Sequence, residues 1–334
     1  MVANAGEKCY YTRRIFCSKK THLDGGDGMR FFVTGAGGQL GHDVMNEVNK
    51  RGYEAVGSGS KPSYSGVQDG SAVCSLPYVQ LDIRDRDAVM KTIAAARPDV
   101  VIHCAAWTAV DAAEAPENRK AVQAVNTLGT RYVAEACKAL DCKMIYISTD
   151  YVFPGGGTSP WQPDEGDYAP LNVYGQSKLA GELAVEELLE KFFIVRTAWV
   201  FGRSGGNFVK TMLRLGKTHE ELRVVNDQIG TPTYTRDLAR LLVDMALTER
   251  FGRYHATNEG GYISWYDFAC EIFRQAGMKV RVQPVSTAEY GLSKAARPFN
   301  SRLDKSKLQE KGFAPLPDWR DALSRYMKEI ETEV

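Results

Sequence analysis

A large net charge, a long apolar run and a regular set of cysteines are all missing from this 334-residue sequence. The 42 lysines and arginines nearly balance the 41 aspartates and glutamates, so a net charge of +1 gives no electrostatic reason to expect a nucleic-acid partner. No apolar run approaches the roughly 18 residues that cross a bilayer, so no membrane partner is expected. The seven cysteines form no close metal-type pair, which predicts reduced thiols, a cytoplasmic location and no protein-ligated metal.

The first 28 residues differ from the rest of the chain. They lack clear periodicity and end in a Gly/Asp cluster, just before Met29 opens the first apolar run. Four basic residues between positions 13 and 20 resemble those of a transit peptide, but serine is scarce and acidic residues are present. We therefore expect residues 1–28 to be a disordered or non-native extension.

From Met29 onward, short apolar runs alternate with helical patterns. This alternation is typical of an α/β fold with a doubly wound parallel sheet, the Rossmann architecture. Strands are expected at 30–34, 53–56, 78–81, 100–103, 143–148 and 192–195. Helices are expected at 40–51, 87–96, 115–140 and 174–191, and an exposed loop at 57–77.

The alternation becomes irregular after Arg196. We predict a dinucleotide-binding domain over residues 29–196 and a smaller C-terminal substrate lobe over residues 197–334. A helical segment near 234–250 is expected to return to the first domain.

A glycine-rich turn lies between the first strand and the first helix. In the segment GAGGQLG, Gly35, Gly38 and Gly41 let backbone amides approach a pyrophosphate, whose charge the helix N-terminus favours. Leu40 makes the spacing G-x-x-G-x-x-G, which differs from the standard G-x-G-x-x-G fingerprint. The strand before it and the helix after it support dinucleotide binding rather than an ordinary turn.

The second strand ends without a carboxylate. An acidic residue there would bind the ribose 2′-hydroxyl and repel a 2′-phosphate. The chain has Ser58, Ser60 and Lys61 instead, so NADPH is at least as acceptable as NADH, unless these residues only belong to a mobile loop. After the third strand, Asp82 either accepts a hydrogen bond from adenine or caps the next turn.

Tyr174 and Lys178 stand four residues apart on an expected helix and share one face. A nearby ammonium favours the phenolate and lowers the pKa of the tyrosine, so that it exchanges a proton near neutral pH. The fifth strand ends in Ser148, Thr149 and Asp150, at the edge where open α/β sheets bind ligands. Thr149 is predicted to hydrogen-bond the substrate oxygen that Tyr174 protonates, unless Ser148 and Thr149 only cap local backbone.

Eight blocks of sequence, in consistent order and spacing, carry a family resemblance. They are the glycine turn, HCAAWTAVDAAE (103–114), STDYVFPG (148–155), PLNVYGQSK (170–178), RTAWVFG (196–202), NFVKTML (207–213), VVNDQIGTPT (224–233) and RPFNSRLD (297–304). From about Met29 to near its C-terminus, the chain closely resembles the dTDP-4-dehydrorhamnose reductases, a family of extended short-chain dehydrogenases.

This resemblance implies that NADPH or NADH reduces the C4 keto group of a nucleotide sugar, dTDP-4-dehydro-L-rhamnose, to give dTDP-L-rhamnose. Tyr174 matches the proton donor, Lys178 the residue that tunes it and holds the nicotinamide ribose, and Thr149 the third catalytic position. The expected cofactor contacts, in addition to Tyr174 and Lys178, are Gly35, Gly38, Gln39, Leu40, Gly41, Asp82, Ile83, Ala105, Ala106, Trp107 and Thr108. The expected substrate contacts, in addition to Thr149, are Asp150, Trp199, Asn207, Gln228 and Arg297.

The chain departs from the family pattern in two places. One extra residue stands in the 155–169 loop, which should shift a loop tip, and Trp107 stands where some relatives have a smaller or more polar group. Some members bind Mg²⁺ at a dimer interface. The sequence gives no location for such a site, and a homodimer is one assembly that the resemblance allows.

Two alternatives to a reductase stay open. A sugar-nucleotide epimerase shares the fold, the glycine turn and the Tyr/Lys pair, whereas a dehydratase would need a glutamate where Tyr151 stands. The regulatory subunit of methionine adenosyltransferase is built on the same scaffold and acts by binding a partner. Its relatives tend to carry serine at the position of Thr149.

Overall fold

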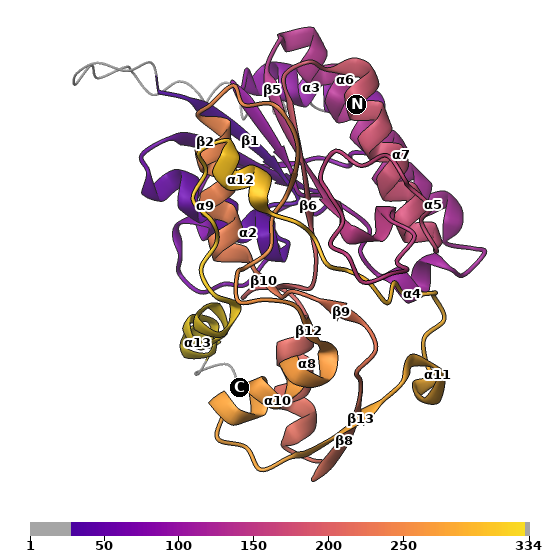
Figure 1. Ribbon diagram of the computed structural model, residues 1–334. Helices are drawn as coiled ribbons and strands as arrows, with labels where there is room; N and C mark the ends of the chain where they lie inside the picture. Colours follow the sequence, from indigo (N-terminus) through magenta and orange to yellow (C-terminus); the bar gives the residue numbers. More distant parts are fainter. Residues whose placement is uncertain (1–27, 331–334) are drawn as a thin grey trace, which may run out of the picture.

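A seven-stranded parallel sheet forms the centre of the computed structural model, which describes residues 28–330 (Figure 1). The prediction for residues 1–28 lies outside the described residues, except at Gly28. The strands run in the order β11-β6-β5-β4-β1-β2-β3. They are β1 (Arg30–Thr34), β2 (Glu54–Gly59), β3 (Tyr78–Gln80), β4 (Val100–His103), β5 (Lys143–Thr149), β6 (Phe192–Thr197) and β11 (Gly252–His255). The predicted doubly wound Rossmann architecture is confirmed.

The apolar strand sequences form this sheet because both of its faces are covered. In β1, the side chains of Phe31 and Val33 join one core cluster and that of Phe32 joins the other. All four residues of β4 are buried. Strands buried on both sides are near-continuous apolar runs, as parallel strands should be.

Helices cover the two faces as separate layers (Figure 1). The cluster on one face includes side chains from α2 (Gln39–Lys50), α9 (Thr235–Ala246) and α12 (Ser306–Glu310). The cluster on the other face includes side chains from α3 (Arg86–Ala96), α6 (Thr130–Leu140) and α7 (Val173–Leu188). The strand order reverses between β1 and β4, and such a switch point is where open α/β sheets bind ligands.

The chain returns to the sheet after a first excursion into the second lobe. The helix α9 lies against α2, and β11 then pairs with β6 in parallel. The strand β11 was not predicted from the sequence. Its four residues, Gly-Arg-Tyr-His, contain one large apolar side chain, Tyr254, and therefore show no strand-like run.

Two predicted segments differ from the structure in more than the positions of their ends. The expected exposed loop at 57–77 begins inside β2, which runs to Gly59, and includes the short helix η1 (Ala72–Cys74). The expected helix at 115–140 is divided into α5 (Arg119–Gln123), a π-helical segment η2 (Ala124–Gly129) and α6, after a separate α4 (Val110–Ala113).

The side chain of Asn126 explains the widened turn of η2. It accepts a hydrogen bond from Trp107 N at 2.8 Å and donates to Ser177 Oγ at 2.9 Å. These contacts hold the segment against both the loop after β4 and α7, and π-bulges often mark functional sites.

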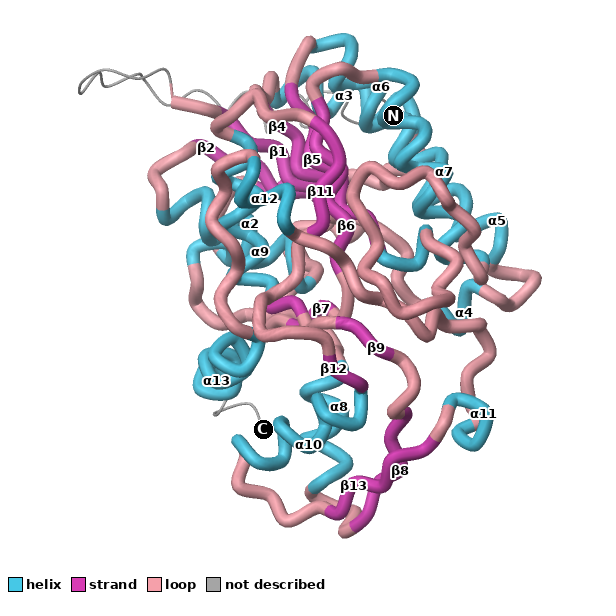
Figure 2. Tube along the Cα trace, viewed as in Figure 1, coloured by secondary structure: helices cyan, strands magenta, loops and turns pink. Residues whose placement is uncertain are grey.

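The second lobe lies beside the carboxyl edge of the sheet (Figure 2). Its apolar cluster includes Phe201, Phe268 and Trp319. Its helices are α8 (Phe208–Gly216), α10 (Trp265–Gln275), α11 (Thr287–Tyr290) and α13 (Trp319–Ile330). Its strands pair as β8 (Glu221–Val225) with β13 (Arg281–Val285), β9 (Ile229–Gly230) with β12 (Ile263–Ser264), and β7 (Val200–Phe201) with β10 (Thr233–Tyr234).

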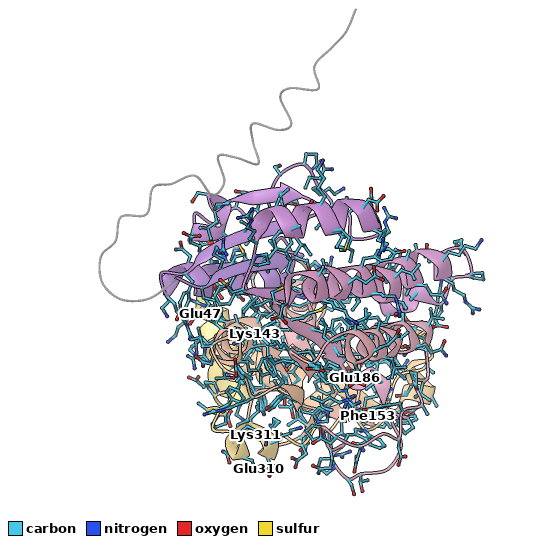
Figure 3. All side chains as sticks on the ribbon, turned by 90° about the horizontal axis from the view of Figure 1, so that it is seen from above. Glu47, Lys143, Phe153, Glu186, Glu310 and Lys311 are labelled. Atoms are coloured by element: carbon cyan, nitrogen blue, oxygen red, sulfur yellow. The ribbon has the colours of Figure 1, made fainter. Side chains whose placement is uncertain are left out.

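A fully buried ion pair ties α7 to β6. The guanidinium of Arg196 donates to both carboxylate oxygens of Glu182, at 2.9 and 2.6 Å, and also to Pro163 O and the Tyr168 hydroxyl. It lies over the ring of Phe153, 5.0 Å from its centroid; that residue is labelled in Figure 3. The pair therefore fixes α7 and the loop before it relative to the sheet.

We expect Glu182→Gln to lower the free energy of unfolding by about 3 kcal/mol, because Arg196 then keeps a buried charge without its partner. Urea denaturation measures the change. The matched control is Glu187→Gln on the same helix, whose partner is Arg131 at 2.7 Å and whose side chain is 60% exposed. That variant should unfold nearly as wild type, and equal losses in the two variants would contradict the role given to the buried pair.

Candidate active site

The glycine turn between β1 and α2 approaches other backbone so closely that side chains do not fit. Gly35 has a positive φ of 69°, and a Cβ placed there would lie 2.7 Å from Ala105 N. A Cβ on Gly41 would lie 2.2 Å from Gly35 O. The turn is therefore held against both the loop after β4 and its own helix, as a phosphate-binding turn requires.

Two cavities meet at this turn, and both are lined by Gly38, Cys104 and Ala106. The first, about 390 Å³, extends towards the ends of β2 and β3, and the second, about 490 Å³, extends towards β5 and α7. Together they form one path across the switch point of the sheet. Such a path suits an elongated dinucleotide, with the pyrophosphate at the glycine turn.

Every residue predicted to contact the cofactor lines one of these cavities. The first cavity is lined by Gly35, Gly38, Asp82, Ile83, Ala105, Ala106 and Trp107. The second is lined by Gly38, Gln39, Leu40, Gly41, Ala106, Thr108, Tyr174 and Lys178.

At the end of the first cavity, the carboxylate of Asp82 caps the following turn. Its Oδ1 accepts a hydrogen bond from Arg84 N at 3.0 Å, and its Oδ2 pairs with Arg84 Nη2 at 2.6 Å, which lowers the pKa of Asp82. The capping interpretation of Asp82 is therefore confirmed, and its contact with adenine stays a prediction. Ser58, Ser60 and Lys61 also line this cavity, and Ser58 is buried at the end of β2 rather than part of a mobile loop.

Three side chains predicted to be catalytic meet at the second cavity. Asn172 caps α7 by accepting a hydrogen bond from Gly175 N at 2.8 Å, which places Tyr174 in the first helical turn and Lys178 one turn later. Thr149 is the last residue of β5. All three catalytic candidates line the cavity, and the hydroxyl of Thr149 lies near enough to the phenol of Tyr174 to influence its pKa.

Lys178 directs its ammonium at the sheet. Its Nζ donates to Ile147 O at 2.7 Å and lies 4.1 Å from the centroid of the Tyr146 ring. Burial lowers the pKa of Lys178 to about 7, since the charged form is poorly solvated there.

The expected lowering of the Tyr174 pKa by Lys178 is wrong. Burial raises the pKa of Tyr174 above its ordinary value, and the nearby Thr149 hydroxyl only partly opposes this effect. Two residues considered in isolation on a helix do not reveal how deeply the surrounding fold encloses them. A raised pKa keeps the phenol protonated at neutral pH, which suits a proton donor.

Asp150 and Trp199 also line the second cavity. Thr149 Oγ1 donates to Asp150 Oδ1 at 2.9 Å and accepts from Tyr151 N at 3.3 Å, so the local capping considered for Thr149 does occur. The backbone of Trp199 has a left-handed φ of 49°, which is uncommon for a bulky residue. Its indole stacks on that of Trp265, with ring centroids 3.8 Å apart.

An aromatic wall of this cavity was not predicted from the sequence. Phe208, Trp265 and Phe268 line it beside Trp199, from the starts of α8 and α10. The capping box of Ser264 and Asp267 marks the start of α10, and this sequence signal could have placed Trp265 at a helix N-terminus.

Three predicted substrate contacts do not line the cavity, because protein partners hold their side chains elsewhere. Asn207 caps α8 and donates to Gln39 Oε1 at 3.1 Å. Gln228 donates to Thr287 Oγ1 at 3.0 Å. Arg297 pairs with Asp111, with its Nη2 2.6 Å from Asp111 Oδ2.

Within residues 28–330, no group of three or more His, Cys, Asp or Glu side chains is arranged to hold a metal ion. In the same range, no helix is both long and apolar enough to span a bilayer.

The sequence is similar to known proteins over most of its length. The family model of the RmlD substrate binding domain matches residues 29–332. A dTDP-4-dehydrorhamnose reductase of Streptomyces griseus is 42% identical over 303 residues, covering 88% of this chain and 92% of that protein. The spore coat polysaccharide biosynthesis protein SpsK of Bacillus subtilis (strain 168) is 37% identical over 300 residues, covering 90% and 97%.

The chain is also similar to solved structures, both in fold and in sequence. The crystal structure of dTDP-4-dehydrorhamnose reductase (rfbD) from Bacillus anthracis str. Ames in complex with NADP has a TM-score of 0.81 and 42% identity, covering 90% of this chain and 99% of that one. The UDP-glucose 4-epimerase of Thermus thermophilus, in complex with NAD, has a TM-score of 0.75 at 20% identity, covering 92% and 100%. The similarity to this epimerase concerns the fold alone.

Proposed function

The chain belongs to the dTDP-4-dehydrorhamnose reductase family, and from this premise we propose that it reduces the C4 keto group of dTDP-4-dehydro-L-rhamnose to give dTDP-L-rhamnose. It is an NAD(P)H-dependent oxidoreductase. The observation that carries the proposal is the single cavity in which Tyr174, Lys178 and Thr149 lie beside the glycine turn.

The two joined cavities fit the nicotinamide cofactor. Gly35 and Gly41 allow the close backbone contacts of the turn, which any side chain would prevent, and the start of α2 favours the pyrophosphate. The first cavity would hold the adenosine half, where Ser60 and Lys61 would bind the 2′-phosphate of NADPH. The bound cofactor supplies the hydride.

The residues of the second cavity supply the proton and hold the reactants. Tyr174 donates a proton to the C4 oxygen, and its raised pKa keeps that proton available. Thr149 lies beside the phenol on the same cavity, where its hydroxyl can bind the same carbonyl oxygen. Lys178 would hold the nicotinamide ribose with its ammonium, which Ile147 O fixes in place.

The sugar occupies the remaining part of the second cavity. Asp150 Oδ2 is enclosed and has no hydrogen-bond partner in the protein, so it suits a sugar hydroxyl. Trp199 and Trp265 form an apolar wall for the face of the sugar. Asn207 acts by positioning Gln39, whereas Gln228 and Arg297 shape loops on the nucleotide side.

The arrangement of the chain supports three further parts of this proposal. We assign α9 and β11 to the cofactor domain, together with residues 29–196. Leu128 on η2 and Leu183 on α7 are 44% and 53% exposed, which suits a homodimer interface. The described cysteines are free thiols, which suits the cytoplasm.

The test of the activity is a mixture of the protein, dTDP-4-dehydro-L-rhamnose and NADPH. Steady loss of reduced-nicotinamide absorbance supports the reductase. Product formation without such loss would indicate an epimerase instead, and binding to a methionine adenosyltransferase without any sugar-nucleotide turnover would indicate a regulatory subunit.

We expect Tyr174→Phe to lower turnover at least about 100-fold while the Kd for NADPH stays within about twofold, because the proton donor is lost and the cavity keeps its shape. Absorbance and fluorescence titration measure the two quantities. The control is Tyr132→Phe on α6, outside both cavities, which should keep wild-type turnover. Unchanged turnover in Tyr174→Phe would refute the role of this residue.

Lys61→Ala should raise the Kd for NADPH roughly tenfold, equivalent to about 1.4 kcal/mol, and leave that for NADH within about twofold. The physical reason is the loss of a cation beside the 2′-phosphate. Isothermal titration with each cofactor checks this result, with Lys91→Ala on α3 as a control for the loss of a surface charge. Equal weakening for both cofactors would place Lys61 away from the 2′-phosphate.

Binding of NADH should weaken severalfold as the pH rises from 6 to 8. The pKa of Lys178 is lowered to about 7, so its ammonium is present below that value and is lost above it. NADH avoids the titration of the 2′-phosphate in NADPH. In Lys178→Gln the binding should be weaker and independent of pH in this range, and an unaltered pH dependence in that variant would assign the effect to another group.

A further inference from the structure

A short segment of the second lobe, residues 203–207, lies against the glycine turn of the first domain. It stands between β7 and α8, and we call it the strap. Asn207 Nδ2 donates to Gln39 Oε1 at 3.1 Å, and a Cβ added to Gly205 would lie 3.7 Å from Gln39 Cγ. Gly206 lines the second cavity. The strap therefore belongs to the wall of the cavity that begins at the phosphate-binding turn.

Ser204 makes the central contact of the strap. It is 1% exposed, and its hydroxyl donates to Gly37 O at 2.8 Å and accepts from Val67 N at 3.3 Å. A serine hydroxyl has one hydrogen to donate, so its donor is used on the glycine turn. One buried side chain therefore joins three segments that are far apart in the sequence: the strap, the glycine turn and the loop after β2.

The carbonyl group that Ser204 holds lies just before the start of α2. Gly38 is the N-cap residue of that helix, and no side chain caps it. The first amides of a helix have no partner within the helix, so those of Gln39 and Leu40, which both line the second cavity, suit a phosphate group. The orientation of the peptide at Gly37 sets the direction in which these amides start, and Ser204 fixes that orientation.

The loop after β2 has anchors other than Ser204. The hydroxyl of Tyr64 lies 2.6 Å from His42 Nδ1, and Val73 N donates to Asn46 Oδ1 at 2.9 Å. Both of these partners belong to α2. Loss of the Ser204 hydroxyl should therefore act on the glycine turn and leave the loop, which borders the first cavity, nearly unchanged.

We propose that Ser204 is a positioning residue of the cofactor site, whose hydroxyl holds the glycine turn from the second lobe in the orientation that binds the pyrophosphate. This inference deepens the proposed function and rests on its cofactor site. Ser204 acts through Gly37 O and needs no contact of its own with the cofactor. The substrate lobe thereby contributes to cofactor binding as well.

The decisive experiment compares two ligands in Ser204→Ala by isothermal titration. NADPH contains the pyrophosphate, whereas adenosine 2′-monophosphate has none and occupies only the adenosine part of the site. We expect the Kd for NADPH to rise at least about tenfold, because Gly37 O loses its buried donor, and the Kd for adenosine 2′-monophosphate to stay within about twofold. In steady-state assays the loss should appear mainly in the KM for NADPH rather than in kcat.

Two further variants complete this comparison. Ser204→Thr keeps the hydroxyl and should bring the Kd for NADPH back to within about threefold of wild type. Ser75→Ala is the matched control, since it also removes a serine hydroxyl that donates to a backbone carbonyl, Ala72 O at 3.2 Å, but lies outside both cavities. It should bind NADPH as wild type does.

Three results would overturn the role of Ser204. An unchanged Kd for NADPH in Ser204→Ala would mean that the glycine turn keeps its orientation without the strap. Equal weakening of NADPH and adenosine 2′-monophosphate would indicate a general effect on the fold. Equal weakening of NADPH in Ser204→Ala and Ser204→Thr would assign the effect to packing rather than to the hydroxyl.

Ser204→Cys takes over the test if Ser204→Ala does not fold. The thiol nearly keeps the volume of the side chain but is a weaker donor, so the Kd for NADPH should rise about threefold or more while that for adenosine 2′-monophosphate stays the same. Wild-type affinity for both ligands in this variant would refute the inference. If wild type itself binds no NADPH, the proposed function fails, whereas normal binding by wild type and Ser204→Ala removes only the role of Ser204.

Discussion

The packing of α7 against the carboxyl ends of β5 and β6 is the constraint on which the positions of the catalytic candidates depend. At the start of the helix, Asn172 caps the first turn and places Tyr174 beside Thr149. One turn later, Lys178 donates to Ile147 O of β5. One turn further, Glu182 pairs with Arg196 of β6 away from solvent. The same helix therefore carries the reactive groups and the contacts that fix their positions.

Much of the fold could be predicted because parallel strands buried on both faces are continuous apolar runs. The strands at 30–34 and 100–103 have the predicted bounds. The strand β11 could not be predicted, because its edge position requires only one large apolar residue, Tyr254. The division of the 115–140 helix arises from contacts of Asn126 with residues far away in the sequence, which no local periodicity reveals.

The candidate site could be predicted wherever a local motif carries the chemistry. The glycine turn and the Tyr174/Lys178 spacing lead directly to residues that line the two cavities. Long-range partners could not be predicted in this way. Pairing of Arg297 with Asp111, and stacking of Trp265 on Trp199, bring together segments separated by more than sixty residues. The pKa of Tyr174 likewise depends on the enclosure that the whole fold creates.

The path of the chain between its two halves has a mechanical consequence. The chain leaves the sheet after β6, returns with α9 and β11, leaves again for α10, and returns once more with α12 before ending in α13. Any rotation of one half relative to the other would therefore have to bend several crossing segments at the same time.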